Sequence, residues 1–247
     1  MLREIKNLLA FLTTLPFRMD DKCLVDSAKL MFLFPLVGVL IGFLAGFFGW
    51  LISYVLPSLL VGVLTLGILL LLTGLHHTDG LLDFGDGVMA QGTAERKVEI
   101  MHDLQTGTGG LSLGIMTFLV TAIAVAELNS VNFVQSIVVA ELSAKLSMVV
   151  GSWAGKSIHM GMNSPFLEAM HGRKGSARLV VALVISFSIA VPLLWIAGAI
   201  AVLVAVITSL VMVAISHRHF KGITGDVLGA TNELTRMVVV IALVAMA

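Results

Sequence analysis

The feature that most constrains this chain is a series of apolar runs, each close to the 20 residues that an α-helix needs to cross a bilayer. Only 12% of the 247 residues are charged, against about 25% in an average soluble domain, so polar side chains are too few to cover a soluble fold. We therefore predict an all-α, polytopic integral membrane helical bundle. Its six clearest spans are residues 31–54, 57–75, 111–128, 132–152, 178–197 and 199–216.

Two further helices are expected at the ends of the chain. Thr224 is a suitable N-cap for a seventh span that runs to Ala247. Residues 2–15 favour a helix lying in the membrane interface, because their apolar side chains share one face: Ile5, Leu8, Leu9 and Leu12. No internal repeat or linker divides the sequence, so residues 1–247 are expected to form one membrane-embedded domain.

Charge distribution predicts the orientation in the membrane. Outside the spans, Lys and Arg fall in the segments 3–29, 96–97, 156–178 and 218–236, which all lie on one side of the predicted spans, and the opposite turns carry none. The positive-inside rule then places the long loops in the cytoplasm. We expect a multi-pass protein of the cell membrane, with the lipid bilayer as a partner and any active site facing the cytoplasm. The net charge of zero gives no reason to expect a nucleic-acid partner.

The densest polar feature is the motif HHTDGLLDFGDG at residues 76–87. In a helix, Asp79, Asp83 and Asp86 would lie within about 60° of one another around the axis and over about 10 Å along it. Carboxylates this close repel unless a cation lies between them, and a set of oxygen ligands favours Mg²⁺, with Mn²⁺ as the other candidate. The alternative is a solvated loop that keeps these carboxylates in water.

Other residues of this motif have supporting roles. His76 and His77 are expected to orient ligands or to be plain interfacial residues. Gly80 and Gly87 weaken a helix, and their presence suits a close approach of the backbone to a ligand.

A second polar segment, IMHDLQTGTGG at residues 100–110, adds Asp103 and a glycine-rich entry to the third span. Backbone N–H groups of Thr108, Gly109 and Gly110 at a helix N-terminus would face an anion such as a phosphate. The plainer interpretation is that the glycines permit a turn into the membrane.

Charged residues inside the later spans leave two interpretations open. Glu141 and Lys145 are four residues apart in the fourth span, and burial of such a pair is costly enough that it must brace the bundle or line a cavity. Asp226 and Glu233, seven apart, lie on one face of the last helix and would either complete an acidic site or fit there without a function.

Several of these motifs, in this order and spacing, resemble the cobalamin synthase family of adenosylcobinamide-GDP ribazoletransferases. The resemblance spans most of the chain, and its pieces are FLTTLP at 11–16, FPLVGVLIG at 34–42, HTDGLLDFGDG at 77–87, IMHD with GTGG at 100–110, and GITGDVLGA at 222–230 with Glu233. Thr14 stands where the family commonly has Arg. His102 and Gln105 stand where it commonly has basic residues, so the positive charges expected to contact phosphate are missing at these two positions.

The resemblance implies Mg²⁺-dependent transfer of the phosphocobinamide group from adenosylcobinamide-GDP to α-ribazole or its 5′-phosphate, with release of GMP. It implies metal ligands Asp79, Asp83, Asp86 and Asp103, catalytic roles for Asp83 and Asp103, and Asp103 as the general base. The substrate-binding residues expected are His77, Thr108, Gly109, Gly110, Lys145, Asp226 and Glu233. The oligomeric state stays open, and a homo-oligomer is possible.

Two rival functions are weighed against this one. A CDP-alcohol phosphotransferase of phospholipid synthesis requires DGxxAR, whereas Asp83 and Phe84 occupy its last two positions here. A cation transporter would place its aspartates near the middle of the membrane, whereas Asp79, Asp83 and Asp86 come at the end of a predicted span.

Overall fold

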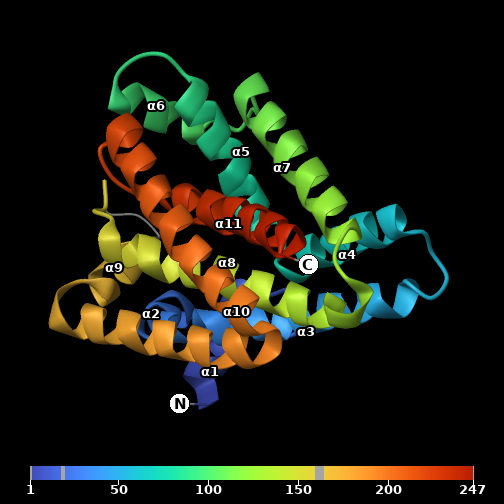
Figure 1. Ribbon diagram of the computed structural model, residues 1–247. Helices are drawn as coiled ribbons and strands as arrows, with labels where there is room; N and C mark the ends of the chain where they lie inside the picture. The colour runs from blue at the N-terminus through green and yellow to red at the C-terminus, as the bar shows by residue number, and fades with distance from the viewer. Residues whose placement is uncertain (1, 18–19, 159–163, 247) are drawn as a thin grey trace.

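The computed structural model describes residues 2–17, 20–158 and 164–246, which form eleven α-helices and two short 3-10 helices (Figure 1). Ala247, expected in the last span, lies outside the described residues. The α-helices are α1 (Leu2–Leu12), α2 (Cys23–Lys29), α3 (Phe34–Ile52), α4 (Ser58–Leu72), α5 (His76–Met89), α6 (Ala94–Met101), α7 (Thr108–Ala126), α8 (Phe133–Ala154), α9 (Ser164–Met170), α10 (Gly172–Phe220) and α11 (Gly225–Ala245). The 3-10 helices are η1 (Met31–Leu33) and η2 (Ser130–Asn132).

Five of these helical segments are long and apolar enough to cross a membrane, and α4 with α5 adds a sixth if that bent pair counts as one span. The 49-residue α10 is broken at Trp195, whose φ of 54° is not helical. Its two arms meet at this break and diverge from it in Figure 1, and they correspond to the two spans predicted at 178–197 and 199–216. The predicted polytopic all-α membrane bundle is therefore confirmed.

The reversal of α10 comes two residues before the turn expected at 197–199. The close approach of the two arms requires a glycine, because a Cβ on Gly198 would lie 2.0 Å from the carbonyl oxygen of Ala190. Proline at position 192, inside the helix, also removes one backbone donor just before the break.

Helix α8 forms the centre of the bundle, with 89% of its most apolar window buried. Helices α3, α10 and α11 all pack against it. The contact with α3 is close: a Cβ on Gly38 would lie 2.5 Å from the carbonyl oxygen of Glu141. Because α8 is enclosed on all sides, its charged side chains are enclosed as well.

The helix that carries the aspartate motif is not a straight continuation of the second span, which was predicted at residues 57–75. Helix α4 ends at Leu72, and α5 leaves it at an angle of 98°. Gly74 and Leu75 make the turn with φ values of 66° and 62°, a conformation that glycine adopts readily and leucine rarely. As a result α5 lies outside the line of the span and packs against α7 and α11.

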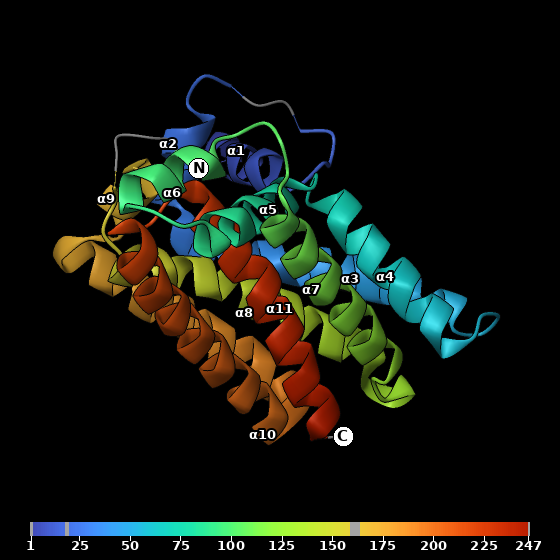
Figure 2. The same cartoon turned by 90° about the horizontal axis from the view of Figure 1, so that it is seen from above.

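Helices α1, α2 and α6 gather at one end of the bundle, as Figure 2 shows. Helix α1 buries Leu8 and Leu12, whereas Ile5, expected on the same apolar face, stays 36% exposed. Its Asn7 is also buried, where the side-chain amide donates hydrogen bonds to the carboxylates of Asp20 (2.8 Å) and Asp26 (3.0 Å). The predicted N-terminal helix is therefore tied to α2 by polar contacts as well as by packing.

Candidate active site

The aspartates of α5 share one region of the helix surface, as their spacing predicted, and a fourth joins them from the start of α11. Burial, followed by the charges of Asp79, Asp226 and Asp86, raises the pKa of Asp83 to about 7. Helix α5 can approach α11 this closely because residue 80 is glycine: a Cβ there would lie 2.8 Å from the backbone oxygen of Asp226. The structure thus brings Asp226 into the acidic cluster of Asp79, Asp83, Asp86 and Asp226.

The acidic cluster has the chemistry of a divalent-cation site, although its side chains are not arranged around one point. In the part of the chain that the structure describes, no group of three or more His, Cys, Asp or Glu side chains is placed to hold a metal ion. The donors are nevertheless all carboxylate oxygens, which Mg²⁺ and Mn²⁺ prefer. The raised pKa of Asp83 also marks crowded negative charge, which a bound cation would relieve. The donor set therefore fits Mg²⁺, and the ion stays a prediction.

Asp86 has a structural contact that its motif did not reveal. Its Oδ2 accepts a hydrogen bond from the backbone N–H of Gly107 at 2.7 Å, and its Oδ1 accepts one from Gly110 at 2.8 Å. The carboxylate therefore satisfies two donors at the start of α7, where the helix dipole also favours a negative charge.

This contact changes the interpretation of the glycine-rich segment. Thr108 is exposed and opens α7. The amide of Gly110 faces an anion, as predicted, but that anion is the protein's own Asp86 carboxylate. Gly109 lies against α5, since a Cβ there would lie 2.8 Å from the carbonyl oxygen of Gly85. The close approaches of Gly80 and Gly87 are likewise to protein, with Gly87 facing Met101 and Phe220.

Asp103 lies in the exposed loop between α6 and α7. Its Oδ1 accepts a hydrogen bond from the backbone N–H of Gln105 at 3.1 Å. The neighbouring His102 is close enough for its charge to act on Asp226, so this loop borders the acidic cluster. The charges that act on Asp83 are those of Asp79, Asp226 and Asp86. The roles of Asp103 as a metal ligand and base stay predictions.

His77 lies on the inner side of α5 and is only 7% exposed. Its Nδ1 has no hydrogen-bond partner, and its backbone packs against Gly229 of α11. Burial, then the charges of Lys145 and Arg236, holds the pKa of His77 well below its ordinary value. The ring is therefore neutral, and one buried nitrogen is left for a water or ligand atom.

Beneath α5 a buried charged network joins α8 to α11, made of Glu141, Lys145, Asn232, Glu233 and Arg236. Arg236 binds both Glu141 and Glu233. The Nζ of Lys145 donates to the Oδ1 of Asn232 at 2.7 Å and lies 4.0 Å from Glu141, and Asn232 donates to Glu233 at 3.0 Å. Two cations offset two carboxylates, so the network as a whole is neutral.

The buried charged network decides between the two interpretations of Glu141 and Lys145 in favour of bracing the bundle. Lys145 and Glu233 are 0% and 1% exposed, and the contacts described above are with protein groups, so a direct contact with substrate would require them to be uncovered. Arg236, counted in the sequence with the cytoplasmic loops, is instead 1% exposed inside the bundle. The sequence does place Arg236 three residues after Glu233 and directly before an apolar run, a spacing that favours an ion pair within a buried helix.

Together the fold and the site define a polytopic helical membrane protein with an acidic cluster where α5 meets α11. Comparison with known proteins adds the family: a model described as cobalamin-5-phosphate synthase matches residues 4–244. The chain belongs to the cobalamin-5-phosphate synthase family.

Curated relatives named adenosylcobinamide-GDP ribazoletransferase support this membership. The chain is 37% identical to that of Methanocella arvoryzae, covering 96% of this chain and 93% of the relative. It is 32% identical to that of Methanococcoides burtonii (98% and 92%), and 31% identical to that of Thermococcus kodakarensis (97% and 98%). No solved structure matches the chain.

Proposed function

We propose that this chain is an adenosylcobinamide-GDP ribazoletransferase of cobalamin biosynthesis. It transfers the phosphocobinamide group from adenosylcobinamide-GDP to α-ribazole or its 5′-phosphate and releases GMP. The observation that carries the proposal is the close packing of Gly80 in α5 against the Asp226 backbone in α11, because it joins two separate motifs that resemble this family at one acidic cluster. The names of the relatives support the same activity.

In the reaction, a ribose hydroxyl oxygen of the acceptor attacks the phosphorus attached to cobinamide. The phosphoanhydride bond to GMP breaks, and the hydroxyl proton passes to a carboxylate. Mg²⁺ held by Asp79, Asp83 and Asp226 would supply positive charge to offset the diphosphate and the departing GMP. Asp103, at the border of the acidic cluster, is the proposed acceptor of the proton.

Other residues position these groups. Asp86 holds the start of α7 against α5 through the amides of Gly107 and Gly110. The buried charged network fixes α11, which carries Asp226, against α8. Catalytic carboxylates need such support, because a displacement of about 1 Å can cost a factor of about 10² in rate.

We also propose that the protein lies in the cell membrane with the acidic cluster facing the cytoplasm. Helix α6, which carries Arg96 and Lys97, lies at the same end of the bundle as α1 and α2 (Figure 2), in agreement with the positive-inside rule. The substrates are then cytoplasmic or dissolved in the inner leaflet.

The test is an assay of purified protein in nanodiscs with adenosylcobinamide-GDP, α-ribazole or its 5′-phosphate, and Mg²⁺. We expect release of GMP together with a cobalamin product, and little of either from Asp83→Asn. Release of CMP from CDP-diacylglycerol and an alcohol, without release of GMP, would favour the phospholipid enzyme. Ion flux in liposomes without either product would favour a transporter.

A further inference from the structure

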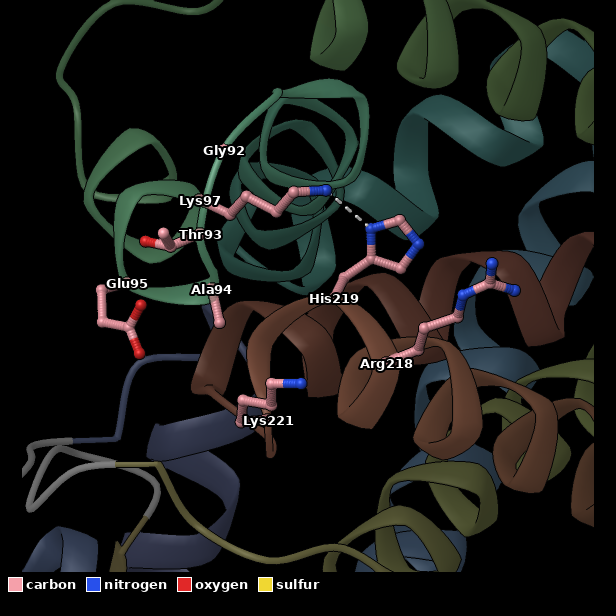
Figure 3. A pocket seen from close by; sticks show the side chains of 8 residues that line it. All are labelled: Gly92, Thr93, Ala94, Glu95, Lys97, Arg218, His219 and Lys221. Carbon is pink, nitrogen blue, oxygen red and sulfur yellow. Dashed lines mark hydrogen bonds between the residues drawn. The ribbon is translucent and has the colours of Figure 1, made fainter.

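A basic cavity of about 460 Å³ lies where the start of α6 meets the end of α10 (Figure 3). Its wall includes the connection from α5 to α6 at Gly92 and Thr93. Its volume is within the range of about 300 to 1,000 Å³ that is typical of ligand pockets. The function proposed above does not use this cavity.

The charges that line the basic cavity are mostly positive. Lys97, Arg218 and Lys221 contribute three cations and Glu95 one carboxylate, so the lining carries two net positive charges with His219 neutral. The ion pairs found across residues 2–17, 20–158 and 164–246 involve none of these three cations. The cavity therefore offers positive charge that no carboxylate of the described chain neutralises at ion-pair distance.

Residues at the basic cavity contact α5, the helix that carries the aspartates. The Nζ of Lys97 lies 2.9 Å from the Nδ1 of His219, toward which it points in Figure 3, and 3.5 Å from the carbonyl oxygen of Val88. Val88 follows Asp83 by five residues, which is about 7.5 Å along a helix axis. The rings of Phe84 and Phe220, 5.9 Å apart, hold α5 to the end of α10. The basic cavity and the acidic cluster are therefore joined through the C-terminal half of α5.

Lys221 adds a second, independent observation. It ends α10 with a φ of 68°, where helices usually place glycine or asparagine because other side chains are strained. Strained positions that keep an unsuitable side chain are concentrated at binding and catalytic sites. The lysine side chain lines the basic cavity, and a charge kept there at the expense of backbone strain indicates that the cavity uses it.

We propose that the basic cavity binds a phosphate monoester, the 5′-phosphate of the acceptor nucleotide. This inference rests on the proposed function. In that reaction the phosphates of the donor lie in the bond being broken, so they belong at the acidic cluster. The acceptor's 5′-phosphate is remote from the reacting hydroxyl and needs cations elsewhere, and Arg and Lys are the side chains that bind phosphate.

The test compares steady-state kinetics with α-ribazole 5′-phosphate and with unphosphorylated α-ribazole, in the wild type and in Arg218→Gln and Lys221→Gln. We expect each variant to raise KM for the phosphorylated acceptor by about tenfold or more, and to change KM for the unphosphorylated acceptor by less than about twofold. Lys174→Gln, which removes an exposed positive charge outside the cavity, serves as the matched control and should behave as wild type. Equal changes with both acceptors would overturn the inference.

A lipid headgroup is the other source of a phosphate. Assays in nanodiscs of phosphatidylcholine alone and with added phosphatidylglycerol separate the two. If the wild type loses its advantage over the variants when the anionic lipid is left out, the cavity binds lipid and the inference fails. If the wild type releases no GMP with either acceptor, the proposed function fails. If it releases GMP with the same KM for both acceptors, only the present inference fails.

Lys221→Gly distinguishes binding from a structural role. Glycine relieves the backbone strain at φ 68°, so we expect an unchanged or higher melting temperature together with the raised KM for the phosphorylated acceptor. A melting temperature or a KM that moves in the opposite direction would contradict the assignment of Lys221 to the phosphate.

Discussion

The Asp86 carboxylate accepts a hydrogen bond from the backbone N–H of Gly110 at 2.8 Å and so joins the aspartate helix to the start of α7. Its other oxygen accepts from Gly107. An aspartate of the acidic cluster is therefore also a helix cap, and its two hydrogen bonds connect α5 to α7 beside the proposed cation site.

The first prediction concerns this cap. Asp86→Asn turns one acceptor oxygen into an NH₂ group, so one of the two hydrogen bonds from Gly107 and Gly110 is lost. Loss of a capping interaction costs about 1 to 2 kcal/mol, which should lower the melting temperature in nanodiscs. Asp21→Asn, at an exposed position outside the acidic cluster, is the control and should keep the wild-type value. Equal melting temperatures for the two variants would contradict the capping role.

The second prediction concerns the contact between α5 and α11. Gly80→Ala places a Cβ within 2.8 Å of the Asp226 backbone, so the helices must move apart, at a cost of about 1 to 3 kcal/mol for overpacking. We expect GMP release to fall by about tenfold or more, because Asp226 is displaced from the other aspartates. Gly67→Ala is the control, since nothing lies within 4 Å of its Cβ position. Wild-type turnover in Gly80→Ala would show that the contact between Gly80 and Asp226 does not fix the position of Asp226 relative to the other aspartates.

The third prediction concerns the buried charged network. Arg236→Met leaves the carboxylates of Glu141 and Glu233 buried without their main partner. Breaking a buried ion pair in this way costs about 3 to 5 kcal/mol, so the variant should melt far lower or fail to fold. Arg173→Gln, which removes an exposed charge, should have little effect. The triple variant Arg236→Met, Glu141→Gln and Glu233→Gln should recover part of the loss, and no recovery would argue against uncompensated charge as the cause.

The fourth prediction concerns Asp83, whose pKa is raised to about 7 by burial and the neighbouring carboxylates. In the unfolded chain an Asp titrates near pH 4. Its contribution to stability is therefore fully present below about pH 4 and is lost as the pH rises through about 7. Since the side chain is only half-buried, solvent screening limits the effect to about 1 to 2 kcal/mol.

Thermal melting in EDTA at pH 5.5 and pH 8 measures this effect. The wild type should lose more stability at pH 8 than Asp83→Asn does. Asp103→Asn, at an exposed carboxylate, should keep the wild-type pH dependence. Added Mg²⁺ at pH 8 should stabilise the wild type and not Asp83→Asn. The same pH dependence in Asp83→Asn and in the wild type would show that the neighbouring carboxylates do not raise the pKa of Asp83.

Much of the fold could be predicted from the sequence, because the bilayer demands long apolar helices and these are visible as apolar runs. The periodicity of Asp79, Asp83 and Asp86 also held within α5. The 98° bend between α4 and α5 could not be predicted, since it depends on a left-handed conformation at Leu75 that leucine seldom adopts.

Less of the site could be predicted from the sequence, because its geometry depends on contacts between distant segments of the chain. The packing of Asp226 against Gly80 of α5 and the capping of α7 by Asp86 are contacts between residues more than 20 positions apart. The burial of Arg236 was missed because a basic residue near the end of a span is also typical of a cytoplasmic border. Only the packing of α11 against α8 decides between the two.

The most direct test of the central claim is a measurement of Mn²⁺ binding to the purified chain in nanodiscs by electron paramagnetic resonance. If Asp79, Asp83 and Asp226 share one cation, both Asp83→Asn and Asp226→Asn should weaken Mn²⁺ binding by about tenfold or more, and Mg²⁺ should displace Mn²⁺ from the wild type. Undiminished Mn²⁺ binding by Asp226→Asn would contradict the claim that α5 and α11 build one metal centre.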